Sequence, residues 1–316
     1  MTITAARAAT QGSIDIALIG LGKIARDQHV PAIAADPRFR LVATVDPHAR
    51  LDGVAGFGSL DGLIADGPPL EAVAICTPPA IRAGLAQRAI AAGWHVLLEK
   101  PPVAKSNEAA AIERQAAAAG VTLFAAWHSQ MAGGVAPARA WLADRAVTSL
   151  DLQWREDIRR WHPGQDWLLA AGGFGVFDPA INAFSILTAI LASPIAIDAA
   201  RLIVPRGRDE PIAGELSLRI GDAPGRASLD FLYEGAPRWE IAIETAAGSL
   251  RLSDGGQRIA GEGIGEVDAV AEYPALYSRF ADLVAARESE VDLAPLLLVE
   301  QAMRCAAIEP GPHFDW

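Results

Sequence analysis

The spacing of apolar and polar positions divides the chain near residue 127. Up to residue 126, short apolar runs alternate with stretches in which apolar residues recur at helical spacing. Strands that alternate with helices pair in parallel through right-handed crossovers, so this half predicts a doubly wound sheet. The expected strands are residues 14–19, 41–45, 73–76, 95–98 and 122–126, and the expected helices are residues 24–35, 60–65, 81–92 and 108–119.

Beyond residue 127, apolar and polar positions alternate with a period of two, which predicts antiparallel strands with one buried face. We expect helices at residues 179–191 and 274–287 to cover that face, and the other face to serve as an oligomer interface. A last helical pattern, residues 296–308, either stays beside this sheet or returns to the first domain. The clearest alternating runs are residues 150–155, 215–220, 227–233 and 239–245.

Composition narrows the classes of protein that fit this pattern. The 316 residues are long enough for two domains, and no charge-free apolar stretch approaches the roughly twenty residues of a membrane span. A formal net charge of −11 argues against a nucleic-acid or anionic-membrane surface, which needs a basic patch.

Cys76 and Cys305 lie far apart in the sequence, and we expect both to be buried, reduced thiols. Residues 1–13 lack the apolar core of a signal peptide, so we expect a disordered tail and a cytoplasmic protein.

A glycine-rich turn follows the first expected strand. Gly20 permits a tight turn, Gly22 lets the backbone approach a pyrophosphate, and the small Ala25 allows close helix packing. A second apolar run, residues 41–45, ends in Asp46, roughly where a ribose-binding carboxylate belongs. The two signals together predict dinucleotide binding, with the phosphates at the helix N-terminus.

These features predict an α/β protein with an N-terminal Rossmann domain, a doubly wound parallel sheet, over residues 14–126. Residues 127–316 are expected to form a C-terminal α+β domain for substrate binding and oligomerisation, with a large, mostly antiparallel open sheet. In doubly wound sheets the ligand binds beyond the carboxyl ends of the strands, so the residues just after each strand are candidates. The expected cofactor-binding residues among them are Gly20, Gly22, Lys23, Ile24, Asp46, Thr77, Pro78, Glu99 and Lys100. Trp127 and His128 follow the last strand.

Lys100 is one of only three lysines among 27 basic residues. It lies in the run Glu99-Lys100-Pro101-Pro102, directly after an apolar stretch. Pro101 restricts the backbone next to Lys100, and a cis Lys100–Pro101 bond is one form that this restriction can take. In a chain that prefers arginine, a lysine at a cleft indicates a need for a compact ammonium group with a tunable pKa. The alternative is a surface lysine that ends a strand.

Asp178 and Asn182 lie four residues apart at the start of an expected helix, so they share one helix face. A carboxylate beside an amide suits a polyhydroxylated ligand. Asp178 also precedes Pro179, a favoured first helical residue, and the alternative is therefore a helix N-cap.

Residues 155–167 combine two tryptophans with charged residues and amides, a composition typical of sugar sites, where aromatic faces stack on C–H surfaces. The alternative is a solvated loop anchored by aromatic side chains. His128 and His162, taken singly, are more often ordinary polar residues than ligands. The sequence has no HxH, HExxH or paired-cysteine spacing and no GxSxG or P-loop run, so we expect no metal site.

These residues together resemble the glucose-fructose oxidoreductase/inositol dehydrogenase/rhizopine catabolism (Gfo/Idh/MocA) family. The resemblance covers nearly the whole chain from residue 14 and includes the GLGKIA fingerprint, the CTPP run, the EKP run and the GG-x-G-x-x-D region. Within the family, the runs IGLGKIARDQHVPAI, LFAAWHS, REDIRRWHPGQDW and GGFGVFDPAINAFSI are most similar to those of bacterial L-arabinose 1-dehydrogenases and D-galactose 1-dehydrogenases.

The resemblance implies an NAD(P)-dependent oxidation of the C1 hydroxyl of a cyclic sugar to a lactone, with hydride passing to C4 of the nicotinamide. Lys100 matches the EKP lysine, which bonds the reacting hydroxyl, and Asp178 matches the acidic residue of the family's D-x-x-x-H motif. Asn182 stands where the family often has a histidine base, and an amide cannot accept a proton at neutral pH. We therefore expect Asp178 to act as the general base, Lys100 to stabilise the alkoxide and Asn182 to position the hydroxyl.

The cofactor and substrate follow from the same resemblance. A carboxylate at Asp46 bonds the adenosine ribose diol and repels a 2′-phosphate, so we expect NAD to be preferred over NADP, while His48 and Arg50 leave room for weak NADP use. We expect the sugar to be L-arabinose, D-galactose or D-fucose. The alternatives are an inositol- or diol-type dehydrogenase acting at another carbon and a non-catalytic NAD-binding sensor. The expected sugar-binding residues are Lys100, Glu156, Trp161, His162, Asp178 and Asn182, with His128 and Gln165 less central.

Overall fold

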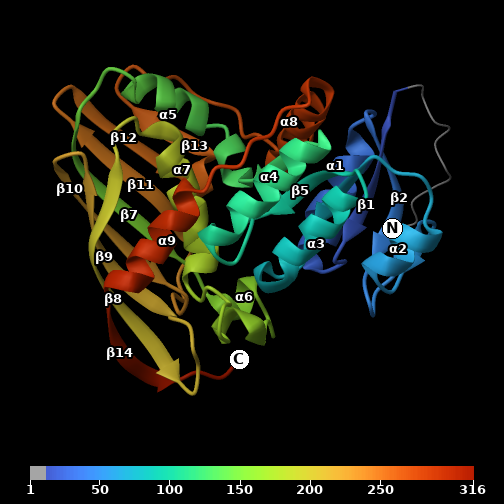
Figure 1. Cartoon of the computed structure of the whole chain (residues 1–316). Helices are drawn as coiled ribbons and strands as arrows, with labels where there is room; N and C mark the ends of the chain where they lie inside the picture. The colour runs from blue at the N-terminus through green and yellow to red at the C-terminus, as the bar shows by residue number, and fades with distance from the viewer. Residues whose placement is uncertain (1–11) are drawn as a thin grey trace. The chain divides into compact units, whose positions relative to one another are not determined.

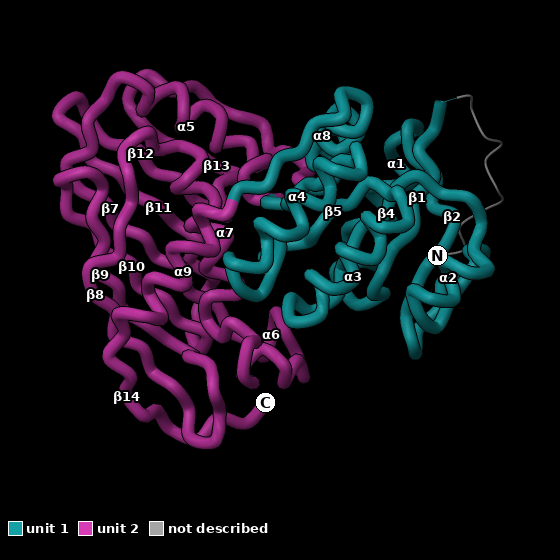
Figure 2. Tube along the Cα trace, in the orientation of Figure 1, with its two compact units in different colours: residues 1–127, 273–292 teal, residues 128–272, 293–316 magenta. Residues whose placement is uncertain are grey.

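The computed structural model describes residues 12–316, and these residues form two compact units (Figure 2). Unit 1 comprises the residues up to 127 together with residues 273–292, and unit 2 comprises residues 128–272 and 293–316. Unit 1 thus includes a segment that the sequence analysis assigned to the second domain. Of the tail expected at residues 1–13, residues 1–11 lie outside the described part of the chain.

A six-stranded sheet forms the centre of unit 1 (Figure 1), and all of its neighbouring strands pair in parallel. The predicted doubly wound parallel sheet is confirmed. Its order is β3-β2-β1-β4-β5-β6, so the direction of winding reverses between β1 and β4, where such sheets bind ligands at the carboxyl ends. The strands are β1 (Ile14–Ile19), β2 (Phe39–Val45), β3 (Ala55–Phe57), β4 (Ala72–Ile75), β5 (His95–Glu99) and β6 (Leu123–Ala126).

The late segment 273–292 joins unit 1 through aromatic packing. In α8 (Glu272–Ala286), the buried Phe280 stacks on Phe39 of β2 at 6.0 Å and on Phe124 of β6 at 6.1 Å. The expectation that residues 274–287 cover the second sheet was therefore wrong, because the apolar stripe of this helix packs on residues of the first sheet. The other helices of unit 1 are η1 (Ala25–His29, a π-helical turn), α1 (Val30–Ala35), α2 (Leu60–Asp66), α3 (Pro79–Ala91), η2 (Ser106–Glu108) and α4 (Ala109–Ala119).

An eight-stranded sheet forms unit 2, in the order β13-β12-β11-β7-β10-β9-β8-β14. It is mostly antiparallel, as predicted, and only β7–β10 and β8–β14 pair in parallel. Along β7, Leu150, Leu152 and Trp154 are buried and the residues between them are not, which is the alternation that the sequence shows. The strands are β7 (Val147–Arg155), β8 (Ile195–Arg206), β9 (Ala213–Ile220), β10 (Ala223–Asp230), β11 (Arg238–Thr245), β12 (Gly248–Ser253), β13 (Arg258–Gly261) and β14 (Ala306–His313).

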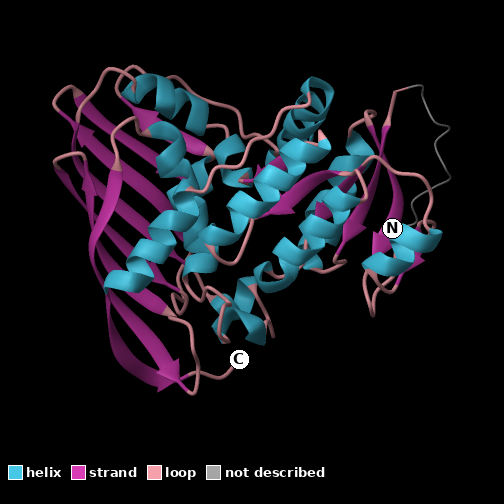
Figure 3. Cartoon of the chain, viewed as in Figure 1, coloured by secondary structure: helices cyan, strands magenta, loops and turns pink. Residues whose placement is uncertain are grey.

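Three helices lie against one face of this second sheet (Figure 3). They are α5 (Val135–Leu142), α7 (Phe177–Ile190) and α9 (Ala294–Cys305). α9 packs on α7 and β8, and the chain then continues as β14 beside β8, so the last helix stays with unit 2 and does not return to the first domain. The helical pattern expected to reach residue 308 ends at Cys305, because the following residues form an edge strand.

The other face of the second sheet is polar. Arg226 of β10 contacts Asp151 of β7, and Arg251 of β12 bonds Glu240 of β11 at 3.0 Å. Exposed ion pairs of this kind each contribute little to the free energy of unfolding, so they make this face polar without stabilising the fold much.

Both cysteines are free thiols. Cys76 is half-buried, but Cys305 is exposed, so the expectation of two buried thiols was wrong for Cys305, which lies at the end of α9 beyond its buried stripe. Within residues 12–316, no helix is long and apolar enough to cross a membrane, and no group of three or more potential ligands is placed to hold a metal ion.

Candidate active site

The glycine turn after β1 has the geometry that the sequence predicts. Gly20 adopts a φ of +88°, and a Cβ there would lie 3.0 Å from Thr77, so only glycine fits without strain. Gly22 is exposed, and a Cβ on it would meet nothing within 4 Å. The turn therefore packs tightly at Gly20 and leaves the backbone open at Gly22.

Asp46 joins the end of β2 to this turn. Its Oδ2 accepts the backbone N–H of Leu21 at 2.9 Å, and its Oδ1 accepts those of His48 and Ala49 at 2.9 and 2.8 Å. Burial opposes the charged form, but these backbone donors and the nearby His48 outweigh it and lower the pKa of Asp46. The carboxylate is therefore ionised at neutral pH. Arg50 lies beside it and donates to the Asp46 carbonyl at 2.6 Å.

The carboxyl ends of the strands in unit 1 fit a dinucleotide. Thr77 Oγ1 is buried without a hydrogen-bond partner among the described residues, so it has a donor and lone pairs to offer. The backbone at Gly22 is open, as a phosphate site requires, and Asp46 offers a carboxylate of the kind that binds a ribose diol in such folds. Of the other expected cofactor residues, Lys23 pairs with Asp27, and Ile24 is 37% exposed. Pro78 precedes α3 as its N-cap residue.

Lys100 follows β5 directly, and the Lys100–Pro101 bond is cis. Its backbone N–H donates to Glu99 Oε2 at 2.8 Å. The buried guanidinium of Arg82, on α3, donates to the carbonyls of Thr77, Glu99 and Pro101. Sequence reasoning missed Arg82, because nothing in its local pattern distinguishes it from the other arginines of the chain.

In unit 2, Asp178 is the second residue of α7 and is 6% exposed. The N-cap of this helix is Val176, without a side-chain cap, so the alternative of Asp178 as an N-cap is wrong. Asn182 lies one turn further along the same helix and is half-buried. A carboxylate and an amide thus share one face of α7, as the spacing predicts.

The glycine run before α7 fixes where the helix begins. Gly175 has a φ of +50°, and a Cβ on it would lie 2.1 Å from the carbonyl of Pro211. Glu210 Oε1 accepts the backbone N–H of Gly172 at 2.8 Å, and burial raises the pKa of Glu210. Glu210 is a second residue that the sequence did not reveal, because its partner lies 38 positions away.

Glu156, predicted to bind the sugar, is buried directly after β7. Its Oε2 accepts the indole N–H of Trp239 at 2.7 Å, and its Oε1 lies 3.3 Å from His162 Nε2. Trp161, at the end of α6 (Ile158–Trp161), lies 5.2 Å from the Trp239 ring and is 37% exposed. Glu156 thus orients an aromatic cluster, and Trp239 is a member that sequence reasoning missed. Gln165 is half-buried just before η4 (Asp166–Leu169).

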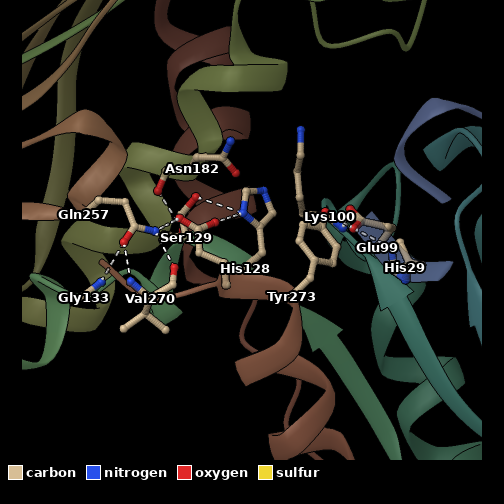
Figure 4. A network of polar contacts seen from close by, with 12 residues as sticks. His29, Glu99, Lys100, His128, Ser129, Gly133, Asn182, Gln257, Val270 and Tyr273 are labelled. Atoms are coloured by element: carbon tan, nitrogen blue, oxygen red, sulfur yellow. Dashed lines mark hydrogen bonds and ion pairs between the residues drawn. The ribbon is translucent and has the colours of Figure 1, made fainter. Parts of the chain in front are cut away.

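His128 opens η3 (His128–Met131), and its Nδ1 lies 2.5 Å from Glu272 Oε2. Gln257 donates to the other oxygen of Glu272 at 2.9 Å. Figure 4 shows the side chain of Asn182 beside the His128 ring, and η3 packs on α7. The structure therefore brings His128 to the polar face of α7.

The expected site residues fall into both units: the cofactor residues and Lys100 belong to unit 1, whereas Asp178, Asn182, His128 and the Glu156 cluster belong to unit 2. A cavity of about 400 Å³ in unit 2, lined by parts of β7 to β10 that include Arg155, Glu215 and Asp230, contains none of them.

The chain is similar to known proteins over most of its length. Residues 14–127 match a family described as an oxidoreductase family with an NAD-binding Rossmann fold. A galactose 1-dehydrogenase of Pseudomonas fluorescens is 44% identical over 291 residues, which cover 90% of this chain and 93% of that protein. The crystal structure of a D-galactose-1-dehydrogenase from Rhizobium etli is 42% identical, with a TM-score of 0.90 over 97% of this chain and 99% of that chain.

A 3-ketoreductase from Actinomadura kijaniata, solved with NADP, has the same fold at 19% identity, with a TM-score of 0.79 over 95% of this chain and 100% of that chain. At this distance the likeness concerns the fold alone. The match over both units at 44% identity carries more weight. The chain belongs to the Gfo/Idh/MocA family of oxidoreductases, and its first unit carries the NAD-binding Rossmann fold of that family.

Proposed function

We propose that this protein is an NAD(P)-dependent aldose 1-dehydrogenase that oxidises the anomeric C1 hydroxyl of D-galactose, L-arabinose or a similar sugar to the lactone. The observation that carries the proposal is the 44% identity to a galactose 1-dehydrogenase, which extends over both units. Lys100 after β5 and the buried Asp178 on α7 supply the chemistry that such a reaction needs.

In the proposed mechanism Asp178 removes the proton of the C1 hydroxyl. The Lys100 ammonium group stabilises the developing alkoxide, and the Asn182 amide positions the hydroxyl. The nicotinamide, when bound, accepts the hydride from C1. Loss of one proton to Asp178 and of one hydride to the cofactor leaves the C1 carbonyl of the lactone, so the step balances.

We propose NAD as the preferred cofactor. The ionised carboxylate of Asp46 hydrogen-bonds a ribose diol but repels a 2′-phosphate. Arg50, bonded to the Asp46 carbonyl, offers a compensating positive charge that permits weak NADP use.

Apart from Lys100, the sugar-binding residues of the proposal lie in unit 2. Trp161 and Trp239 offer aromatic faces, and His162, Asn182 and His128 offer polar atoms. Glu156 holds Trp239 and His162 in place, because its two oxygens face those rings. D-Galactose and L-arabinose have the same configuration from C1 to C4, so such a pocket accepts both if it tolerates the extra hydroxymethyl group.

We also propose that the polar face of the second sheet binds a second copy of the chain. The charged side chains of Arg226 and Asp151 on this face can exchange partners across a symmetric interface. Sedimentation velocity of the wild type and of Arg226→Glu tests this proposal. A monomeric wild type contradicts it.

The activity is tested by following NADH formation with D-galactose, L-arabinose, D-fucose, D-glucose and myo-inositol, with product identification by NMR. Formation of galactono- or arabinono-lactone supports the proposal. An oxidised product at another carbon supports an inositol- or diol-type dehydrogenase. NADH binding without turnover of any sugar supports a sensor.

A further inference from the structure

A cluster of buried polar side chains lies in unit 1 beneath the end of β5. We call it the Glu99 cluster, and it consists of His29 from η1, Glu99 from β5, and Tyr273 and Tyr277 from α8. The exposed fractions are 0% for His29, 3% for Glu99, 5% for Tyr273 and 0% for Tyr277. None of these groups takes part in the mechanism proposed above.

Both oxygens of Glu99 are bonded. Oε1 accepts the hydroxyl of Tyr273 at 2.6 Å and lies 3.1 Å from His29 Nε2. The other ring nitrogen of His29 lies 2.8 Å from the hydroxyl of Tyr277. Two elements far apart in the sequence therefore fix the same carboxylate.

The pKa of His29 is shifted upward by the groups around it. Burial by itself disfavours the imidazolium, but Cys76, Tyr277 and Glu99 together raise the pKa of His29 well above its usual 6.5. Burial raises the pKa of Tyr277 to about 12. Tyr273 also faces His29, with its ring centroid 5.0 Å from the imidazole.

The cluster meets Lys100 through the backbone. Glu99 Oε2 accepts the Lys100 N–H at 2.8 Å, and Arg82 donates to the carbonyls of Glu99 and Pro101 on either side of it. Figure 4 shows the Lys100 side chain extending away from the Glu99–His29 pair. The backbone on both sides of Lys100 and its own N–H are thus held in place, while its side chain extends elsewhere.

We propose that His29, Glu99 and Tyr273 are positioning residues for Lys100, which they hold in the orientation that the reaction requires. Stability alone does not account for the cluster, because buried hydrogen-bonded polar groups can often be replaced together by apolar residues of the same shape with little loss of stability. The proposal rests on the role of Lys100 in the proposed function.

Tyr273→Phe provides the sharpest test. It removes only the hydroxyl that bonds Glu99, and it keeps the ring that packs edge-on against His29 at 5.0 Å. We expect kcat to fall roughly tenfold, the effect of losing one hydrogen bond to a charged group, while the KM for sugar and the Kd for NADH change less than about twofold. Tyr233→Phe, a half-buried tyrosine of unit 2, is the matched control and should leave all three values unchanged.

Hydrogen exchange supplies a readout that does not depend on turnover. The Lys100 amide should exchange slowly in the wild type and at least about fivefold faster in Tyr273→Phe and Glu99→Gln. Glu99→Gln replaces the charged acceptor of this amide by a neutral one, and Tyr273→Phe removes the bond that holds the carboxylate in position. If Glu99→Gln does not fold, Tyr273→Phe decides. An unchanged kcat with unchanged exchange overturns the proposal, as does a parallel loss of kcat and NADH affinity, which indicates general disruption.

Lys100→Ala separates this proposal from the proposed function. If Lys100→Ala retains turnover, the catalytic role of Lys100 is wrong, and the positioning proposal falls with it. If Lys100→Ala abolishes turnover while Tyr273→Phe behaves as the wild type, only the positioning role is wrong.

Discussion

The indole N–H of Trp239 donates to the Glu156 carboxylate at 2.7 Å, which joins β11 to the end of β7 inside unit 2. The second oxygen of Glu156 lies 3.3 Å from His162 Nε2, so one carboxylate contacts the rings of both Trp239 and His162. The buried glutamate therefore shapes the wall of the proposed sugar site more than it contacts the sugar.

Replacement of Glu156 by Ala should weaken sugar binding without affecting the cofactor. Loss of a charged partner of Trp239 and His162 should raise the KM for D-galactose by at least about tenfold. The Kd for NADH, measured by fluorescence, should stay unchanged, because the cofactor residues lie in unit 1. Glu234→Ala, at an exposed site in the same unit, is the control. An unchanged KM in Glu156→Ala would contradict the role of the cluster.

Asp178→Asn should abolish the proposed base while keeping the shape of the side chain. General-base removal typically costs a factor of about 10² to 10⁴, so kcat should fall within that range. NADH affinity should remain, and the exposed Asp222→Asn should behave as the wild type. Near-normal turnover in Asp178→Asn would transfer the base role to another residue.

Asp46→Ser should reverse the cofactor preference. Removal of the carboxylate eliminates its repulsion of a 2′-phosphate and its bond to the ribose diol, so kcat/KM should fall for NAD and rise for NADP. Arg50→Gln, made in the wild type, should reduce whatever NADP activity exists. A wild-type enzyme that already prefers NADP would refute the assignment of Asp46.

Gly20→Ala and Gly22→Ala should have opposite consequences. A Cβ at Gly20 combines a φ of +88° with a contact of 3.0 Å to Thr77, so the free energy of unfolding should drop by about 1–3 kcal/mol. A Cβ at Gly22 enters open space, so stability should hold while NADH binds more weakly. Thermal unfolding and NADH titration of both variants distinguish the two effects. Equal loss of stability would show that Gly22 is structural.

The stability of the protein should decrease with pH because of His29. Its folded-state pKa lies above the unfolded value of 6.5, so its contribution is complete below pH 6.5 and is lost as the pH rises through the folded pKa. The slope reaches at most about 1.4 kcal/mol per pH unit. Urea unfolding from pH 6 upward, at roughly half-unit steps, should show this slope in the wild type and not in His29→Gln. The exposed His48→Gln should retain it.

Local pattern predicted much of the fold for a physical reason. Apart from β3, the strands of unit 1 are mostly buried and form nearly continuous apolar runs in the sequence. The alternation along β7 and β9 reflects one buried face. β3 escaped prediction because its three residues are largely exposed, and β8 because its buried positions follow no regular period. Where the buried positions of a strand do not follow a simple period, the sequence pattern does not predict the strand.

The sequence by itself determined the glycine turn, Asp46, Lys100 and the Asp178–Asn182 face, because each depends on residues within one turn or one strand end. Only the tertiary structure decided that α8 belongs to unit 1 and that Tyr273, Glu99 and His29 meet there. It likewise decided that Arg82 hydrogen-bonds the Glu99 carbonyl beside Lys100 and that the Trp239 indole hydrogen-bonds Glu156. Such contacts join positions that lie far apart along the chain. Periodicity reports which face of an element is buried, but not which distant side chain packs against it.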